Sequence, residues 1–346
     1  MNNSIKKVLK IVSAAAVVTA LVLRPQAASQ GAKEALELCF STVVPSLFPF
    51  MTVSAYILNS DVASLLGKRS EKLCRFLFDL PKEAGVIFVM SLVGGFPVGA
   101  RLTADSLQKG RLTENQAKRM LLFCVNPGPA FVIGIVGIAM LGSRRAGVIL
   151  FASVCFSSLI TGIISRFFKD GNEIRHYSTH FDTKSPLILS VKESINAIIG
   201  VCGWIVIFSA LSGVVNSFFF DEMMKQFLNM AAEVTGGCGI SAKSFPLPVT
   251  ALVLGWSGVC VHLQLMTYIS ACRLKYRHFA VARIFNGVVS MAVSFVLFRI
   301  FPCETSVFSN AGEILPQTVS VSVPATAGLL FLFALIILDL APKRKV

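Results

Sequence analysis

Charged side chains are scarce in this sequence. Asp, Glu, Lys and Arg make up 14% of its 346 residues, and only 18 residues are acidic, whereas about a quarter of the residues in a soluble domain are charged. Hydrophobic residues reach 54%, and the mean hydropathy is +0.73. The shortage of charge excludes an ordinary soluble domain. Together with the excess of apolar residues, it predicts a membrane protein.

Motifs for nucleotide, metal and covalent chemistry are also missing. The chain has no GxxxxGK[ST] phosphate loop, no GxSxG, HExxH or HxE…PCxxC pattern, and no CxxC pair among its nine cysteines. His176 and His180 are four residues apart but have no cysteine or carboxylate partner beside them, which is a weak metal pattern. We therefore predict no enzymatic activity, no cofactor and no metal site.

The net charge of +14 comes mainly from basic residues in short loops beside apolar runs. This placement fits the positive-inside bias of membrane proteins and contact with anionic lipid headgroups. It does not indicate a nucleic-acid partner. The expected partners are the bilayer and a small-molecule solute, and whether the chain forms a homo-oligomer stays open.

Runs without Asp, Glu, Lys or Arg predict the membrane spans, because about 20 apolar residues cross a bilayer as a helix. Two shorter runs, 11–23 and 284–298, are flanked by basic residues that can reach the interface. Residues 61–82 carry apolar residues at helical spacing among lysines and arginines, which predicts an interfacial amphipathic helix. We predict one all-α polytopic domain over residues 1–346 with about eight spans. The six long runs are 38–60, 120–143, 146–165, 194–220, 244–272 and 314–338.

Two apolar segments are interrupted by glycine and proline. Residues 94–101 read GGFPVGAR and residues 126–129 read NPGP. Proline removes a backbone donor and glycine costs about 1 kcal/mol in a helix interior. Non-helical backbone survives at membrane depth only where protein buries it or where it lines a cavity. We therefore predict re-entrant hairpins and broken helices, the construction that many secondary transporters use for substrate sites.

The interruptions recur, which suggests two weak repeats of inverted orientation. The first, residues 83–168, contains the breaks at 94–99 and 126–129. The second, residues 233–300, contains Glu233 and a further break at 255–258. Corresponding interrupted segments in two halves point to a binding site between them. We expect the breaks at 94–99 and 126–129 to line one central cavity with residues 257–264.

Several polar side chains in or beside these breaks are candidates for substrate contact or ion coupling. Arg101 is either a counter-charge for an anionic substrate or an interfacial arginine paired with Asp105 or lipid phosphate. Asn126 either binds substrate or caps the second half-helix. His262 either binds substrate and couples protons or bonds a neighbouring helix, and Glu233 either couples ions or caps a helix. The predicted substrate-binding set is Gly94, Gly95, Pro97, Gly99, Arg101, Asn126, Pro127, Gly128, Pro129, Ser257, His262 and Gln264, with Glu233 and His262 as coupling residues.

Four segments together resemble the nucleoside-recognition or Gate domain: residues 94–101, FCVNPGPAFVIG at 123–134, EVTGG at 233–237 and GWSGVCVHLQ at 255–264. Within it, the chain is most similar to the sporulation integral membrane proteins of the YlbJ type. The resemblance covers roughly residues 35–300 and implies a fold related to concentrative nucleoside transporters. For the YlbJ type it implies a role in spore formation, with dipicolinate as the proposed solute.

The functional expectation is a secondary transporter or channel-like permease for a small polar or anionic solute. The resemblance adds dipicolinate during sporulation. The alternatives are a nucleoside transporter and a non-transporting scaffold of the sporulation machinery. The expected location is a bacterial cell membrane, crossed several times, with a spore-associated membrane as the variant that the resemblance implies.

Overall fold

The computed structural model describes residues 11–12, 15, 17–60, 71–72, 74–168, 185–218 and 221–303. The regular elements in these residues are all helices. Five of them are long and apolar enough to cross a membrane. The expected count of about eight spans is not confirmed; the run at 314–338 lies outside the described residues. The five candidate spans are Pro25–Ile57, Arg144–Ser165, Pro186–Asn216, Leu247–Gln264 and Tyr276–Ile300.

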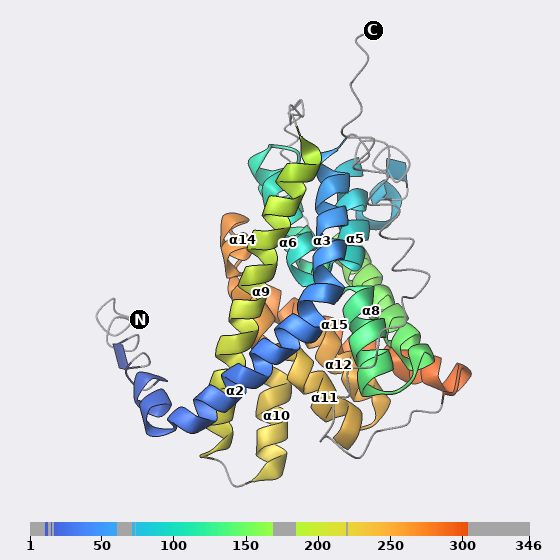
Figure 1. Cartoon of the computed structure of the whole chain (residues 1–346). Helices are drawn as coiled ribbons and strands as arrows, with labels where there is room; N and C mark the ends of the chain where they lie inside the picture. The colour runs from blue at the N-terminus through green and yellow to red at the C-terminus, as the bar shows by residue number, and fades with distance from the viewer. Residues whose placement is uncertain are drawn as a thin grey trace.

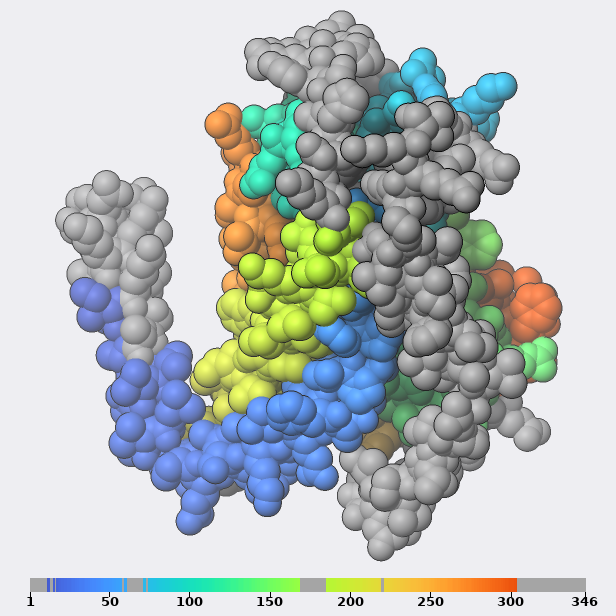
Figure 2. All heavy atoms as spheres, turned by 45° about the horizontal axis from the view of Figure 1, so that its top comes forward, coloured from blue at the N-terminus to red at the C-terminus, as the bar shows by residue number. Residues whose placement is uncertain are grey.

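Two long antiparallel segments form one side of the molecule. Helices α2 (Pro25–Leu38), η1 (Cys39–Val43) and α3 (Val44–Asn59) follow one another without a loop and pack along α9 (Pro186–Asn216). Figures 1 and 2 show the blue and yellow-green segments side by side. Both spans start earlier than the charge-free runs 38–60 and 194–220, so those boundaries were wrong. A charge-free window cuts α9 short because Lys192 and Glu193 lie inside the helix.

In the first half of the chain, five helices separated by short breaks or loops pack in the interior. Helix α5 (Lys82–Gly94) packs against α6 (Phe96–Gln108), and α7 (Glu114–Phe123) follows after a short loop. Thr113 and Gln116 form a reciprocal capping box at the start of α7. The expected span 120–143 is divided: α7 ends at Phe123, η2 (Ala130–Met140) begins after the NPGP break, and α8 (Arg144–Ser165) follows.

The second half repeats the use of short interrupted helices. Helices α10 (Glu222–Ala232) and α11 (Val234–Ser244) meet at Glu233, and α12 (Leu247–Trp256) and α13 (Gly258–Gln264) meet at Ser257. Helix α14 (Met266–Ala271) leads to α15 (Tyr276–Ile300), which packs between α12 and α8 (Figure 1). Gly255 and Gly287 let α12 and α15 approach closely, since a methyl group at Gly255 would lie 2.5 Å from the Gly287 Cα.

Helix α15 distributes its side chains as a membrane helix does. Its buried positions include Arg283, Asn286 and two serines, while Val281, Ile284 and Val288 are exposed. A water-soluble helix would bury the apolar set and expose the polar one. The reversed pattern supports a lipid environment around α15.

The predicted interfacial helix at 61–82 lies mostly outside the described residues. Its end is helical at residues 74–78. Phe78 is buried there and its ring lies 4.9 Å from Phe123 and 5.4 Å from Phe88. This aromatic cluster ties the end of the segment to α5 and α7. His176 and His180 also lie outside the described part of the chain.

Candidate functional site

The two breaks of the first half contact each other in the interior. Gly95 has φ +84°, a left-handed backbone that favours glycine. A methyl group on Gly128 would lie 3.3 Å from the Gly95 amide nitrogen. At Gly99, a methyl group would lie 1.8 Å from the carbonyl oxygen of Cys124. The predicted GGFPVG and NPGP segments are therefore brought together by close backbone contact, which we name the first crossing (residues 94–99 and 124–129).

Asn126 satisfies the backbone at this crossing. Its amide nitrogen donates to the Phe123 carbonyl at 2.9 Å and to Ser91 Oγ at 3.3 Å, and its oxygen accepts from Ser158. The side chain thus completes the C-terminal end of α7. Of the two interpretations of Asn126, the cap of the second half-helix is wrong, because Pro129 holds the N-cap position of η2 and no side chain caps that helix. Substrate binding by Asn126 stays a prediction.

A second crossing (residues 232–234 and 257–258) occurs in the other half. A methyl group on Gly258 would lie 3.0 Å from the Ala232 carbonyl oxygen and the Glu233 Cα. Glu233 is buried and caps α11, since its carboxylate accepts hydrogen bonds from the amides of Thr235 at 2.8 Å and Gly236 at 2.6 Å. The geometry matches the interpretation of Glu233 as a helix cap. The coupling role of Glu233 stays a prediction.

Ser257 holds the break between α12 and α13 in a left-handed conformation, with φ +75°. This backbone costs a non-glycine residue about 1–2 kcal/mol. Such strain persists only where surrounding contacts fix the conformation. Here the hydroxyl of Ser257 accepts a hydrogen bond of 2.7 Å from Arg283.

Arg283 joins the two crossings. The side chain is fully buried, and its guanidinium donates to the Val125 carbonyl at 2.5 Å and to the Gly255 carbonyl. The Gly255 carbonyl lies in the last turn of α12 and the Val125 carbonyl lies two residues beyond the end of α7. Both are therefore near the C-terminal end of a helix, where the dipole places partial negative charge. Two helix ends and the Ser257 hydroxyl therefore compensate this buried cation, which forms no ion pair with a carboxylate in the described part of the chain. Arg283 is one of the basic residues that flank the run 284–298, which we expected to reach the membrane interface. Its burial shows that this expectation was wrong for Arg283.

Asn286 extends this connection one turn along α15. Its amide nitrogen donates to the Leu122 carbonyl at 3.2 Å, and its oxygen accepts from Ser157 and Thr161 of α8, each at 3.1 Å. Helices α7, α8 and α15 are thus linked by polar side chains in the interior. No sequence signal singled out these residues, because serines, threonines and asparagines in apolar runs are common.

His262 is buried beside α15. Its Nδ1 lies 3.2 Å from the Tyr276 hydroxyl and its Nε2 lies 3.0 Å from the Trp256 carbonyl oxygen. Its ring also lies edge-on to Phe279, at 5.2 Å between centroids. These contacts match the interhelical reading of His262. Gln264 is half-buried at the end of α13.

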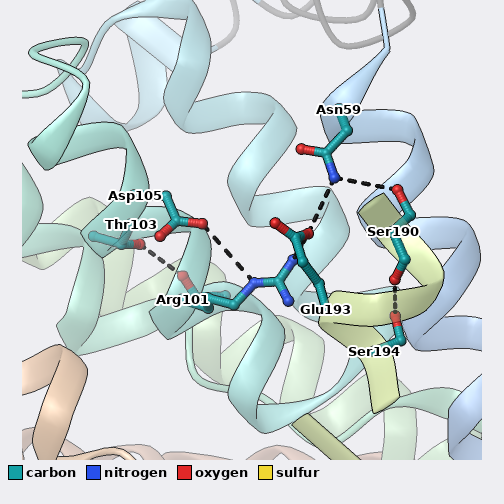
Figure 3. Close-up of polar contacts among 8 residues, drawn as sticks. Asn59, Arg101, Thr103, Asp105, Ser190, Glu193 and Ser194 are labelled. Carbon is teal, nitrogen blue, oxygen red and sulfur yellow. Dashed lines mark hydrogen bonds and ion pairs between the residues drawn. The ribbon is translucent and has the colours of Figure 1, made fainter. Parts of the chain in front are cut away.

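Arg101 lies in a second polar cluster, separate from Arg283. Its Nη2 donates to Glu193 Oε2 of α9 at 2.8 Å, and its Nε is 3.9 Å from Asp105. Asn59 at the end of α3 donates to the same Glu193 oxygen at 3.0 Å and to Ser190 at 3.1 Å. Figure 3 shows Arg101 and Glu193 facing each other between α6 and α9. We name Asn59, Arg101, Asp105 and Glu193 the charged cluster.

A small cavity adjoins the charged cluster. Its volume is about 10 Å³, which is room for about one water molecule. Pro97 and Arg101 of the predicted site line it, whereas the NPGP break and residues 257–264 do not. The lining residues in the described part of the chain are Met51, Ala55, Pro97, Val98, Arg101, Ser194, Ala197 and Tyr268. The breaks thus pack against each other instead of lining this cavity together.

Arg101 was a predicted site residue, but its main partner was not predicted. The expected alternatives were Asp105, lipid phosphate or substrate, whereas the shortest ion pair is to Glu193. The available signal was a glutamate placed near the start of a long apolar run, with Lys192 beside it. An acidic residue there needs a partner, because a charge at membrane depth is costly.

Five helices apolar enough to cross a membrane, buried polar side chains and the outward-facing apolar side chains of α15 define a helical membrane protein with interrupted helices. The chain is similar to "Sporulation integral membrane protein YlbJ" of Bacillus subtilis (strain 168), with 24% identity over 86% of this chain and 85% of that protein. This similarity supports the resemblance to the YlbJ type. No family model matches the chain, and no solved structure matches it.

Proposed function

We propose that this chain is a membrane permease for a small polar or anionic solute, acting in spore formation. The carrying observation is the pair of backbone crossings that Arg283 joins in the interior. Interrupted helices cost stability wherever they occur in a membrane. Their presence in both halves is typical of transporters that alternate access around a central site. A scaffold has no use for them.

The proposed solute is a carboxylate, with dipicolinate as the candidate that the YlbJ resemblance suggests. Two observations support an anion. The N-terminal ends of α6 and η2 lie beside each other at the first crossing, and each of these two ends is the positive end of its helix dipole. Arg101 lies one to two turns from that end of α6 and faces a cavity. A nucleoside is the alternative solute and would depend on amide contacts from Asn126 and Gln264.

The proposed architecture has two repeats and a fold related to the Gate domain. In each half, an interrupted helix pair crosses a second interrupted helix: Gly95 against the NPGP break, and Glu233 against Ser257 and Gly258. This correspondence supports the repeats at 83–168 and 233–300. Glu233, which lies in the second crossing, and His262 of α13, the helix that follows it, are the proposed coupling residues.

The test is transport by the purified protein in liposomes. We expect loaded pyridine-2,6-dicarboxylate to leave liposomes that contain the protein faster than it leaves loaded liposomes without protein. The efflux should be at least tenfold slower for Arg101→Gln. Uridine uptake in the same liposomes tests the alternative, with Gln264→Ala as its diagnostic variant. Uridine transport that Gln264→Ala abolishes and Arg101→Gln spares would replace the carboxylate by a nucleoside. Movement of neither solute would favour the scaffold.

A further inference from the structure

We propose that Glu193 of α9 is a resident carboxylate that occupies Arg101 when no solute is bound, and that a solute carboxylate takes its place. Exchange of partner on Arg101 would detach the N-terminal half of α9 from α6 and open the cavity between them. This inference rests on the proposed function and adds the residue that couples solute binding to helix movement.

The Arg101–Glu193 contact is suited to exchange. Glu193 accepts from one guanidinium nitrogen, Nη2, and the same oxygen also accepts from Asn59. The buried Nε of Arg101 has no hydrogen-bond partner among the described residues. A guanidinium can bind a carboxylate through two parallel hydrogen bonds. A planar carboxylate that engages two nitrogens would therefore hold Arg101 better than Glu193 does.

The pair is also accessible enough to be replaced. The side chains of Arg101 and Glu193 retain 17% and 29% of their exposure. Arg283 is different, because it is fully buried and donates to three acceptors. An ion pair with partial water access gains little net stability. Its loss to an equivalent pair with a solute would therefore cost the fold little.

The packing of α9 differs between its two halves. In the C-terminal half, Gly213 lies against α2: a methyl group there would be 2.6 Å from the Ala27 carbonyl oxygen, and one on Gly31 would be 2.4 Å from the Ser209 carbonyl oxygen. In the N-terminal half, the contacts to α3 and α6 include hydrogen bonds of Ser190 and Glu193. The closely packed C-terminal half of α9 can therefore act as a pivot, and the N-terminal half, which is held by hydrogen bonds of side chains, can change its partners.

The cavity beside Arg101 must grow for a solute to enter. Its volume of about 10 Å³ is far below the roughly 300 Å³ of a small-molecule site. Ser194 and Ala197 of α9 form one wall, and Pro97 and Val98 of α6 form another. Separation of α9 from α6 enlarges the space directly next to the guanidinium. Asp105 lies on α6 with Arg101, so exchange at Asp105 would not move α9.

Direct binding tests the proposal without a transport assay. Isothermal titration of pyridine-2,6-dicarboxylate into the detergent-purified protein is compared for the parent, Glu193→Gln, Asp105→Asn and Arg101→Gln. Removal of the resident carboxylate should tighten binding about tenfold in Glu193→Gln, and Arg101→Gln should abolish binding. Asp105→Asn should change affinity less than Glu193→Gln, and the exposed Glu37→Gln is the control for loss of one negative charge. The proposal is overturned if Glu193→Gln binds the dicarboxylate as tightly as the parent or more weakly, or if neither the parent nor Glu193→Gln binds it.

A charge exchange separates a resident carboxylate from a permanent structural pair. The double variant Arg101→Glu with Glu193→Arg keeps one guanidinium and one carboxylate at the α6–α9 contact. We expect it to unfold within a few degrees of the parent but to bind the dicarboxylate at least tenfold more weakly, because the cation has moved to α9. Parent-like binding by this variant would contradict the exchange. Tighter binding by Glu193→Gln without transport would reject the proposed function alone.

Discussion

Two arginines of this chain meet the problem of a cation inside a membrane protein in different ways. Arg283 is fully buried and is compensated by carbonyls at two helix ends and by the hydroxyl of Ser257. Arg101 keeps some exposure and is compensated by carboxylates, chiefly Glu193 of another helix. The first arrangement fixes backbone to backbone, whereas the second joins two side chains that can separate. We infer that Arg283 holds the framework and that Arg101 serves the solute.

The largest effect should follow from removal of the Arg283 guanidinium. Arg283→Met leaves two buried carbonyls and a buried hydroxyl without their donor, and we expect a loss of about 3–5 kcal/mol in unfolding free energy. The measurement is denaturant unfolding in detergent micelles. Arg299→Met is the matched control on α15, because Arg299 is exposed and its cation–π contact with Phe295 is all that the substitution removes in the described residues. It should change stability by less than about 1 kcal/mol. A similar small change for both variants would contradict the framework role.

The next effect tests the first crossing. Gly99→Ala places a methyl group 1.8 Å from the Cys124 carbonyl oxygen, and the backbone must shift to admit it. We expect destabilisation of about 1–3 kcal/mol. Gly134→Ala is the control on η2, where a methyl group meets nothing within 4 Å, and it should be neutral or stabilising. Equal melting temperatures of the two variants would show that the crossing is loose.

A smaller effect distinguishes the two roles of Ser257. Ser257→Ala loses the hydroxyl and keeps the strained φ of +75°, whereas Ser257→Gly loses the hydroxyl and relieves the strain. We expect Ser257→Gly to be more stable than Ser257→Ala by about 1 kcal/mol, with both below the parent. Thermal unfolding of the three proteins gives the comparison. The reverse order of the two variants would remove the argument from backbone strain.

The smallest effect on stability should come from the charged cluster. Glu193→Gln keeps an oxygen that can accept from Asn59 and removes one charge from a pair with partial exposure. We expect a change of less than about 1 kcal/mol in unfolding free energy. A loss as large as that of Arg283→Met would mean that the pair is part of the framework, and the contrast between the arginines would fail.

The interruptions were predictable from sequence, because glycine and proline act locally. The breaks at Gly95, at NPGP and at Ser257 all lie where the sequence placed them. Helix ends were less predictable: α9 begins at Pro186, eight residues before the charge-free run starts at Ser194. A charge can remain inside a helix when another helix supplies its partner, and that partner is a tertiary fact.

The arginine environments were not predictable for the same reason. The carbonyls that bind Arg283 are 28 and 158 residues away in sequence, and Glu193 is 92 residues from Arg101. A local sequence pattern indicates that a polar residue in an apolar run needs a partner. It does not name the partner, which depends on how the breaks cross.

Hydrogen–deuterium exchange with and without pyridine-2,6-dicarboxylate tests the contrast between the arginines most directly. The account predicts faster amide exchange in residues 186–197 of α9 when the solute is present, because Glu193 has left Arg101. The peptide that contains Val125 and the peptide that contains Gly255 should keep their exchange rates, because Arg283 retains its contacts with both residues. Unchanged exchange in residues 186–197, or faster exchange around Val125 and Gly255, would contradict the account.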